Sequence, residues 1–346
     1  MGVKQYFKEE LSERDAQVLR LVVRYYVANA MPVGSESLVR HSNLQWSSAT
    51  IRNIFARLED LGYIEHPHTS AGRMPTEKGY RFFVNTLEDF SVHNDDAQAI
   101  SGFHFETPNS ETLFREVSQL LGKISGQLGL IAASYTSAGV LHKIELIPLS
   151  STRILVVLAI RSGFVKSVVL EVQSGIPAEK LEIVAQTLTE RLHGRALSEW
   201  RNYFDEYVRT SESVEASIVQ MILCAPGLFD DPFDMQTIYV SGAPNVLLQP
   251  EFRSGEQLHN IMELIDDEPS VAGVLYEHVP APDTVAVRIG SEHSDARLHS
   301  CSSIAAQYQW RDVTGMIGLI GPTRLQYDRL APLVSYLART LSSARE

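Results

Sequence analysis

The chain has 346 residues, a formal net charge of −12 and 44% hydrophobic residues. This length suits two or three domains that each bury a core. The first residues, MGVKQYFKEE, lack the apolar segment of an export signal, and the most apolar run, Ile154 to Ile160, is too short to span a bilayer. The two cysteines, Cys224 and Cys301, form no CxxC pair. We therefore expect a reduced, cytoplasmic protein with no metal, no other cofactor and no membrane contact.

The acidic charge is unevenly distributed along the chain. Residues 1–90 hold eleven basic and eleven acidic side chains, so the whole acidic excess lies after residue 90. A locally basic region on an acidic body suits a protein that binds DNA through one face only. An enzyme with an acidic surface fits the same charge count, so charge alone does not decide the function.

Two helices are expected before residue 47. Ser12 and Asp15 have the spacing of a capping box, and the apolar periodicity that follows continues to about Ala30. A short helix from Glu36 to about His41 comes next. In a helix-turn-helix, such a short helix braces the helix that reads the bases.

The segment from Ser47 to Leu61 predicts the helix on which the functional argument depends. Its isoleucine, phenylalanine and leucine residues recur at three- and four-residue steps, and Gly62 suits the left-handed turn that ends a helix. The opposite face is polar. An arginine can pair with both acceptors of guanine, and an asparagine can pair with adenine in the same way. The candidate DNA-binding residues on this helix are Ser47, Ser48, Thr50, Arg52, Asn53 and Arg57.

Exposed arginines on an amphipathic helix are also typical of a helix that only faces solvent. The sequence that follows favours DNA binding. Residues 63–66 predict an edge strand, residues 68–73 predict a turn-forming loop with one arginine at its tip, and a further helix begins after Thr76. This order predicts a winged helix-turn-helix, whose loop contacts the DNA backbone or minor groove. The loop adds four candidate DNA-binding residues, which are His68, Thr69, Ser70 and Arg73.

The rest of the chain predicts a polar linker, then strands, helices and strands again. The linker is residues 89–109, and a helix is expected over 110–130. The expected strands are 144–149, 154–160, 165–172, 238–241, 273–277, 284–289, 298–307 and 315–320. The other expected helices are 178–192, 198–208, 214–223 and 328–341. One α/β domain interrupted by an insertion explains this order.

Several runs of sequence resemble one family. They are SSATIRN at 47–53, LEDLGYI at 58–64, PHTSAGRMPTEKGYRFFV at 67–84, IGSEH at 289–293 and GLIGPTRLQY at 318–327. In this order they are similar to blocks of the HrcA family of bacterial heat-inducible transcription repressors. The resemblance spans nearly the full chain.

The resemblance implies an α+β multidomain fold and a set of partners. The expected parts are a winged-helix DNA-binding domain at 1–88, a GAF-like domain in two parts at 110–174 and 263–346, and an inserted, mainly helical dimerisation domain at 175–262. The implied protein is a homodimer that binds a CIRCE-type inverted-repeat operator on double-stranded DNA and represses chaperone genes. Its activity is expected to depend on the GroE chaperonin and to be lost on heat stress.

No motif predicts an enzyme, because the chain lacks GxSxG, HExxH and a P-loop. Arg324 is expected to pair with an acidic residue such as Glu292. Two alternatives stay open at this point. One is a regulator whose GAF-like domain binds a small molecule that sets the DNA affinity. The other is a GAF-like binding or enzymatic protein whose winged helix is only an interaction module.

Overall fold

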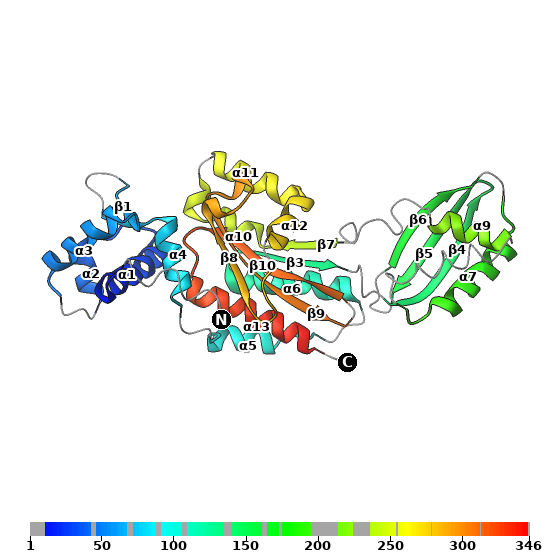
Figure 1. Ribbon diagram of the computed structural model, residues 1–346, viewed down its shortest axis with the longest axis horizontal. Coiled ribbons are helices and arrows are strands. Elements are labelled where there is room, and N and C mark those ends of the chain that lie inside the picture. Colours follow the sequence, from blue (N-terminus) through cyan, green and yellow to red (C-terminus); the bar gives the residue numbers. More distant parts are fainter. Residues whose placement is uncertain are drawn as a thin grey trace.

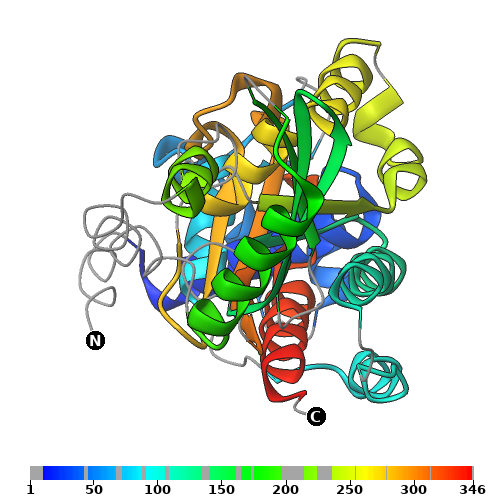
Figure 2. The same cartoon turned by 90° about the vertical axis from the view of Figure 1, so that its right-hand side faces the viewer.

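The computed structural model shows a mixed α+β protein with three parts in a row (Figure 1). We call them the head (residues 11–87), the body (residues 91–134 and 236–344) and the insertion (residues 140–223). Figure 2 looks along this row from the end that carries the insertion. The structure describes residues 11–42, 46–67, 72–87, 91–105, 109–134, 140–160, 165–172, 175–195, 214–223, 236–253, 255–277, 279–311 and 313–344.

The helices of the head begin at local caps. Ser12 and Asp15 form the expected capping box at the start of the first helix, and the Ser47 hydroxyl accepts the Thr50 N–H at 3.2 Å at the start of the third. Gly62 has a φ of +74°, as expected for a left-handed helix end. The elements of the head are α1 (Glu13–Asn29), α2 (Ser35–His41), α3 (Ser48–Asp60), β1 (Ile64–Glu65), β2 (Met74–Pro75) and α4 (Glu77–Asn85).

The base of the β1–β2 hairpin is fixed against the turn between α1 and α2. Val33 and Arg73 exchange two backbone hydrogen bonds of 2.8 and 2.9 Å. Gly72 approaches so closely that a Cβ atom there would lie 2.4 Å from the carbonyl carbon of Val33. Only glycine fits this contact without a shift of the backbone.

The body is built on an antiparallel sheet in the order β7-β3-β10-β9-β8. Alternate residues of a strand point to opposite faces, so Ile131 packs on one face and Leu130 on the other. Figure 1 shows α10, α11 and α12 on one side of this sheet and α5, α6 and α13 on the other. Helices therefore cover both faces.

The elements of the body come from two stretches of the chain, one before and one after the insertion. The first contains α5 (Asn94–Ser101), α6 (Ser110–Ser125) and β3 (Leu128–Ser134). The second contains β7 (Gln236–Ser241), α10 (Ala243–Leu247), η2 (Pro250–Arg253), α11 (Gly255–Asp266), α12 (Glu268–Tyr276), β8 (Val285–Ile289), η3 (Gly290–Glu292), η4 (Ala296–Leu298), β9 (Cys301–Trp310), β10 (Val313–Pro322) and α13 (Tyr327–Ser343).

The insertion has its own sheet and its own core. Its elements are β4 (Leu141–Ser150), β5 (Arg153–Ile160), β6 (Val165–Glu171), α7 (Ala178–Leu192) and α9 (Val214–Leu223). The three strands form a separate antiparallel sheet. Apolar residues of α7 and α9 pack on one face of this sheet, where Ile144, Val156 and Leu181 are buried.

The boundaries of this unit differ from the expected residues 175–262. The strands expected in the body at 144–172 belong instead to the insertion, whereas β7, α10 and α11 belong to the body. The chain leaves the body after β3 and returns at β7, where Ser134 pairs with Gln236. Apolar alternation predicts a strand but not its partner strand, which explains the error.

Three smaller expectations are also corrected. Residues 89–109 are not only a linker, because they contain α5, whose buried Asp96 accepts two hydrogen bonds of 2.8 and 2.9 Å from Arg329. The expected helix over 110–130 ends at Ser125, and β3 follows it. The expected strand 273–277 lies in α12. The expected helix 198–208 lies outside the described residues.

Candidate nucleic-acid interface

The polar face of α3 is exposed while its apolar face anchors the helix. Ile51, Phe55 and Leu58 are buried in the core of the head. Arg52 and Asn53 are exposed on the opposite side. Within the part of the chain that the structure describes, neither side chain has a hydrogen-bond or ion-pair partner. Both are thus available to a molecule outside the chain.

The hydroxyl-bearing candidates lie at the N-terminal end of α3. The Ser47 hydroxyl caps the helix and lies 3.0 Å from the hydroxyl of Thr50. Ser48 is partly exposed beside them. This end of a helix carries a partial positive charge that favours an anion. These three residues can therefore contact a phosphate next to the bases that Arg52 and Asn53 would reach.

Arg57 already has a partner inside the head. Its guanidinium forms an ion pair with Asp15 of α1, whose side chain is only 3% exposed. Burial alone would raise the pKa of Asp15, but hydrogen bonds from Arg57 and Ser12 outweigh this effect and hold the pKa below its usual value. Arg57 thus ties α3 to α1, a role that its position in the sequence did not reveal.

Arg73 lies directly before the second hairpin strand and pairs with Val33, not at the tip of the loop where the sequence placed it. Its side chain is 18% exposed and turns back to Glu59 at the end of α3, with a nitrogen–oxygen distance of 2.7 Å. A second guanidinium nitrogen lies 2.6 Å from Nδ1 of His66. Arg73 therefore fixes the hairpin to α3. His68, Thr69 and Ser70 lie outside the described residues.

A polar joint connects the head to the body, and it was missed in the sequence. Arg81 of α4 binds the carboxylate of Glu292 with an Nε–Oε1 distance of 2.7 Å and donates to the carbonyl of Val287 at 2.7 Å. Glu77, one turn earlier, accepts the backbone N–H of Ser291 at 3.1 Å and its hydroxyl. Glu77 and Arg81 have the spacing of an ordinary pair within one helix, so the sequence held no signal for a partner in the body.

Arg324 also belongs to this joint, with a partner different from the expected Glu292. Its guanidinium forms an ion pair with Glu251 and donates to the side-chain oxygen of Gln249 at 2.8 Å. It also reaches the carbonyl of Val27 at 3.4 Å, at the C-terminal end of α1. Nearby, the rings of Tyr80 and Tyr327 pack with centroids 5.9 Å apart.

A buried histidine lies directly beside the joint. Nδ1 of His293 is 3.2 Å from a carboxylate oxygen of Glu277, and Nε2 has no partner among the described residues. Burial lowers the pKa of His293, and the hydrogen bond to Glu277 offsets only part of this effect. The imidazole is therefore neutral in the folded protein at neutral pH.

Comparison with known proteins now assigns the chain. Residues 111–331 match the model of the HrcA protein C-terminal domain. A heat-inducible transcription repressor HrcA of Chlorobium chlorochromatii is 34% identical over 340 residues, which cover 96% of this chain and 97% of that protein. One of Chlorobaculum tepidum is 34% identical and covers 97% of this chain and 98% of its own length. The chain belongs to the HrcA family.

A solved structure supports the arrangement of the whole HrcA chain. It is described as a hypothetical protein, is 26% identical in sequence and superposes with a TM-score of 0.64 over 96% of this chain and 98% of its own. HrcA proteins are transcription repressors, which agrees with a head that exposes arginine and asparagine on one helix. Among the described residues, no helix is both long and apolar enough to cross a membrane.

Proposed function

We propose that this HrcA protein is a homodimeric repressor of chaperone genes that binds an inverted-repeat operator through its two heads. The observation that carries the proposal is the polar face of α3, where Arg52 and Asn53 are exposed above a buried apolar face. The element order of the head is that of a winged helix-turn-helix, with α3 as the helix that enters the major groove. The body, a sheet with helices on both faces, corresponds to the GAF-like domain.

Ser47, Ser48 and Thr50 would position α3 on the DNA backbone, and Arg52 and Asn53 would read base edges. Arg57 and Arg73 hold α3 in place through Asp15 and Glu59. They contribute to DNA binding mainly by orienting the helix. The loop residues His68, Thr69 and Ser70 remain predicted contacts to the DNA backbone or minor groove.

Dimerisation is assigned to the insertion, because the described residues leave one face of its sheet uncovered. Apolar side chains on this face are 40–57% exposed, whereas the opposite face is buried under α7 and α9. In register, Leu155 lies between Ile147 and Val169, so these three residues adjoin one another, and Leu149 follows Ile147 on the same face. Val165 lies farther along this face, beyond Ser167. A contiguous apolar patch is typical of a protein interface. The exposed apolar residues are Ile147, Leu149, Val165 and Val169.

A second copy of the chain is the partner that suits an inverted repeat. Each half of the operator presents the same sequence to one subunit, so a two-fold dimer places two copies of α3 in equivalent grooves. Joining two heads raises the overall affinity by about 10²–10⁴ without a new contact. The insertion thus supplies the affinity that one head alone lacks.

The proposed regulation follows the family. Chaperonin of the GroE type maintains the repressor, and heat withdraws the chaperonin so that repression ends. The protein works in the cytoplasm, without an enzymatic activity or a cofactor. A gel-shift titration tests the proposal with a palindromic operator, a single half-site and a scrambled duplex, at two salt concentrations and with or without chaperonin. Binding of equal strength to the operator and the scrambled duplex would overturn the assignment to a repressor.

A further inference from the structure

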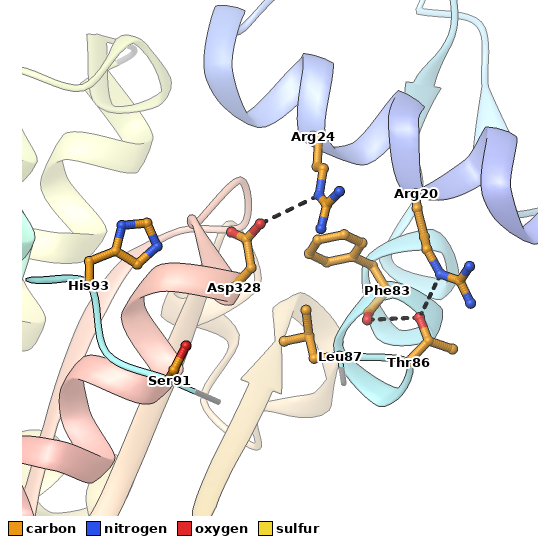
Figure 3. A pocket seen from close by; sticks show the side chains of 8 residues that line it. All are labelled: Arg20, Arg24, Phe83, Thr86, Leu87, Ser91, His93 and Asp328. Atoms are coloured by element: carbon orange, nitrogen blue, oxygen red, sulfur yellow. Dashed lines mark hydrogen bonds and ion pairs between the residues drawn. The ribbon is translucent and has the colours of Figure 1, made fainter. Parts of the chain in front are cut away.

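A cavity of about 420 Å³ lies where the head meets the body. Figure 3 shows that its lining comes from three places. Arg20 and Arg24 project from α1, Phe83, Thr86 and Leu87 come from α4 and the residues after it, and Ser91, His93 and Asp328 come from the body side. The volume lies within the range of small-molecule sites, ~300–1,000 Å³.

Among the residues that the structure describes, the lining carries two arginines and one carboxylate. Arg20 and Arg24 are four residues apart on one helix, a spacing at which like charges repel each other. Carboxylates near them offset this only in part. Glu13 lies 3.7 Å from Arg20 but is 88% exposed, so water screens it, and Asp328 lies 3.5 Å from Arg24. An anion between the two guanidinium groups would relieve the repulsion.

The same space has an apolar wall beside the arginines. Arg20 Nε donates to the Thr86 hydroxyl at 3.5 Å, and this hydroxyl donates to the carbonyl of Phe83 at 3.1 Å. Phe83 and Leu87 form the apolar part, and the guanidinium carbon of Arg24 lies 5.9 Å from the centre of the Phe83 ring. In Figure 3 both arginines are directed toward the residues below α1.

We propose that this junction cavity binds a small organic phosphate monoester. Two guanidinium forks one helical turn apart can each donate two hydrogen bonds to one phosphate group. The organic part of the ligand packs on Phe83 and Leu87. Because the lining comes from both head and body, the bound ligand joins the two parts and favours the head orientation seen here.

Binding is tested by calorimetry on the full chain with three probes. Phenyl phosphate should bind, inorganic phosphate should bind more weakly, and phenol should not bind. Arg20→Gln and Arg24→Gln should each lower the affinity for phenyl phosphate by about tenfold or more, because each removes a charge-assisted contact. Arg14→Gln, which changes an exposed arginine of α1 outside the cavity lining, is the matched control. Equal affinities of all four proteins would overturn the site.

Asp328→Asn should change the affinity for phenyl phosphate in the opposite direction. This substitution removes the carboxylate of the lining and frees Arg24, so phenyl phosphate should bind about three- to tenfold more tightly. A mere loss of packing would weaken binding instead. Thermal unfolding of each variant without ligand shows that it is folded. Weaker or unchanged binding to this variant would contradict an anion site.

The expected effect of the ligand on operator binding rests on the proposed function, whereas the calorimetric test of ligand binding does not. A gel shift with the operator, with and without saturating phenyl phosphate, should show a change in affinity in the wild-type protein and none in the double variant Arg20→Gln, Arg24→Gln. If calorimetry detects the ligand and the chain binds no operator, the proposed repressor function fails and the cavity stands. If the chain binds the operator but no probe, the cavity proposal fails alone.

Discussion

The two ends of this HrcA chain expose surfaces of opposite chemistry. On the head, the open face of α3 is polar and carries Arg52 and Asn53, whereas on the insertion the open face of the sheet carries exposed apolar residues such as Ile147 and Val169. Each surface lies opposite a well-packed apolar face of the same element. The body holds both ends, so one chain can present one surface to DNA and the other to a second copy.

The largest effect should follow removal of the apolar end. Deleting residues 135–235 and joining Ser134 to Gln236 by an asparagine-glycine turn preserves the β3–β7 pair, because a two-residue turn can connect antiparallel neighbours. The product should fold as a monomer, and its affinity for the operator should fall by a factor of about 10²–10⁴. Light scattering and a gel shift measure the two properties. A dimer of full affinity would place the dimer interface elsewhere.

A milder change keeps the insertion and alters only its surface. Ile147→Lys combined with Val169→Lys places charge on the open face of the sheet and should dissociate the dimer, since charge is disfavoured in the core of an interface. Ile183→Lys, on the exposed side of α7, is the matched control because that residue is apolar and 58% exposed but lies off this face. Equal behaviour of the two proteins in light scattering would contradict the assigned interface.

At the polar end, Arg52→Ala should lower operator affinity by about 1–3 kcal/mol for each half-site and leave binding to random DNA nearly unchanged. The reason is that a bidentate base contact is lost while the phosphate contacts stay. Arg14→Ala, an exposed arginine on α1, is the control for general charge. A gel shift on both DNAs gives the ratio. An equal loss on operator and random DNA would show that Arg52 touches only phosphate.

A substitution of Arg57 tests whether this residue orients α3 or contacts DNA itself. Arg57→Met leaves the buried carboxylate of Asp15 without its cation and should lower the free energy of unfolding by about 1–3 kcal/mol, since the pair is only partly shielded from water. Urea denaturation measures this change. The double variant Asp15→Asn, Arg57→Met should recover part of the loss. If Arg57→Met unfolds at the same urea concentration as the wild type, Arg57 is free to bind DNA instead.

The smallest effect concerns the histidine beside the joint. The folded chain holds the pKa of His293 below its ordinary value, so below about pH 6.5 the unfolded chain binds more protons and the folded state loses stability as the pH falls. The slope is at most about 1.4 kcal/mol per pH unit, and it ends below the folded-state pKa. His293→Asn should remove this slope in urea denaturation between pH 7 and 5. Parallel curves for the two proteins would exclude the histidine as the cause.

The head was predicted well because its signals are local. The capping box at Ser12 and the left-handed Gly62 are properties of single residues and their neighbours, and both occur as expected. Arg73 was misplaced because its ion pair with Glu59 depends on how the hairpin folds back. Backbone type can be inferred from a short window, but a side-chain partner across the fold cannot.

The insertion was predicted less well for the same reason. The runs that became β4, β5 and β6 have the alternation of any half-buried strand, and only pairing shows that they form a separate sheet. β3 was not predicted, because Leu128 continues the apolar spacing of α6. Gly126 nevertheless ends that helix in the left-handed conformation. The run Gly273–Glu277 is apolar enough for a strand, yet Asp267 caps a helix there.

The distribution of the cores has a consequence for heating. One continuous hydrophobic cluster runs from Val22 and Phe83 of the head to Trp310 and Leu337 of the body, whereas the insertion has a cluster of its own. Head and body should therefore melt together as one cooperative unit, and the insertion should melt as another. If the smaller unit melts first, the two subunits of the proposed dimer would separate while each head still keeps its folded surface. Warming would then weaken operator binding through lost avidity, before any damage to the helix that reads the DNA.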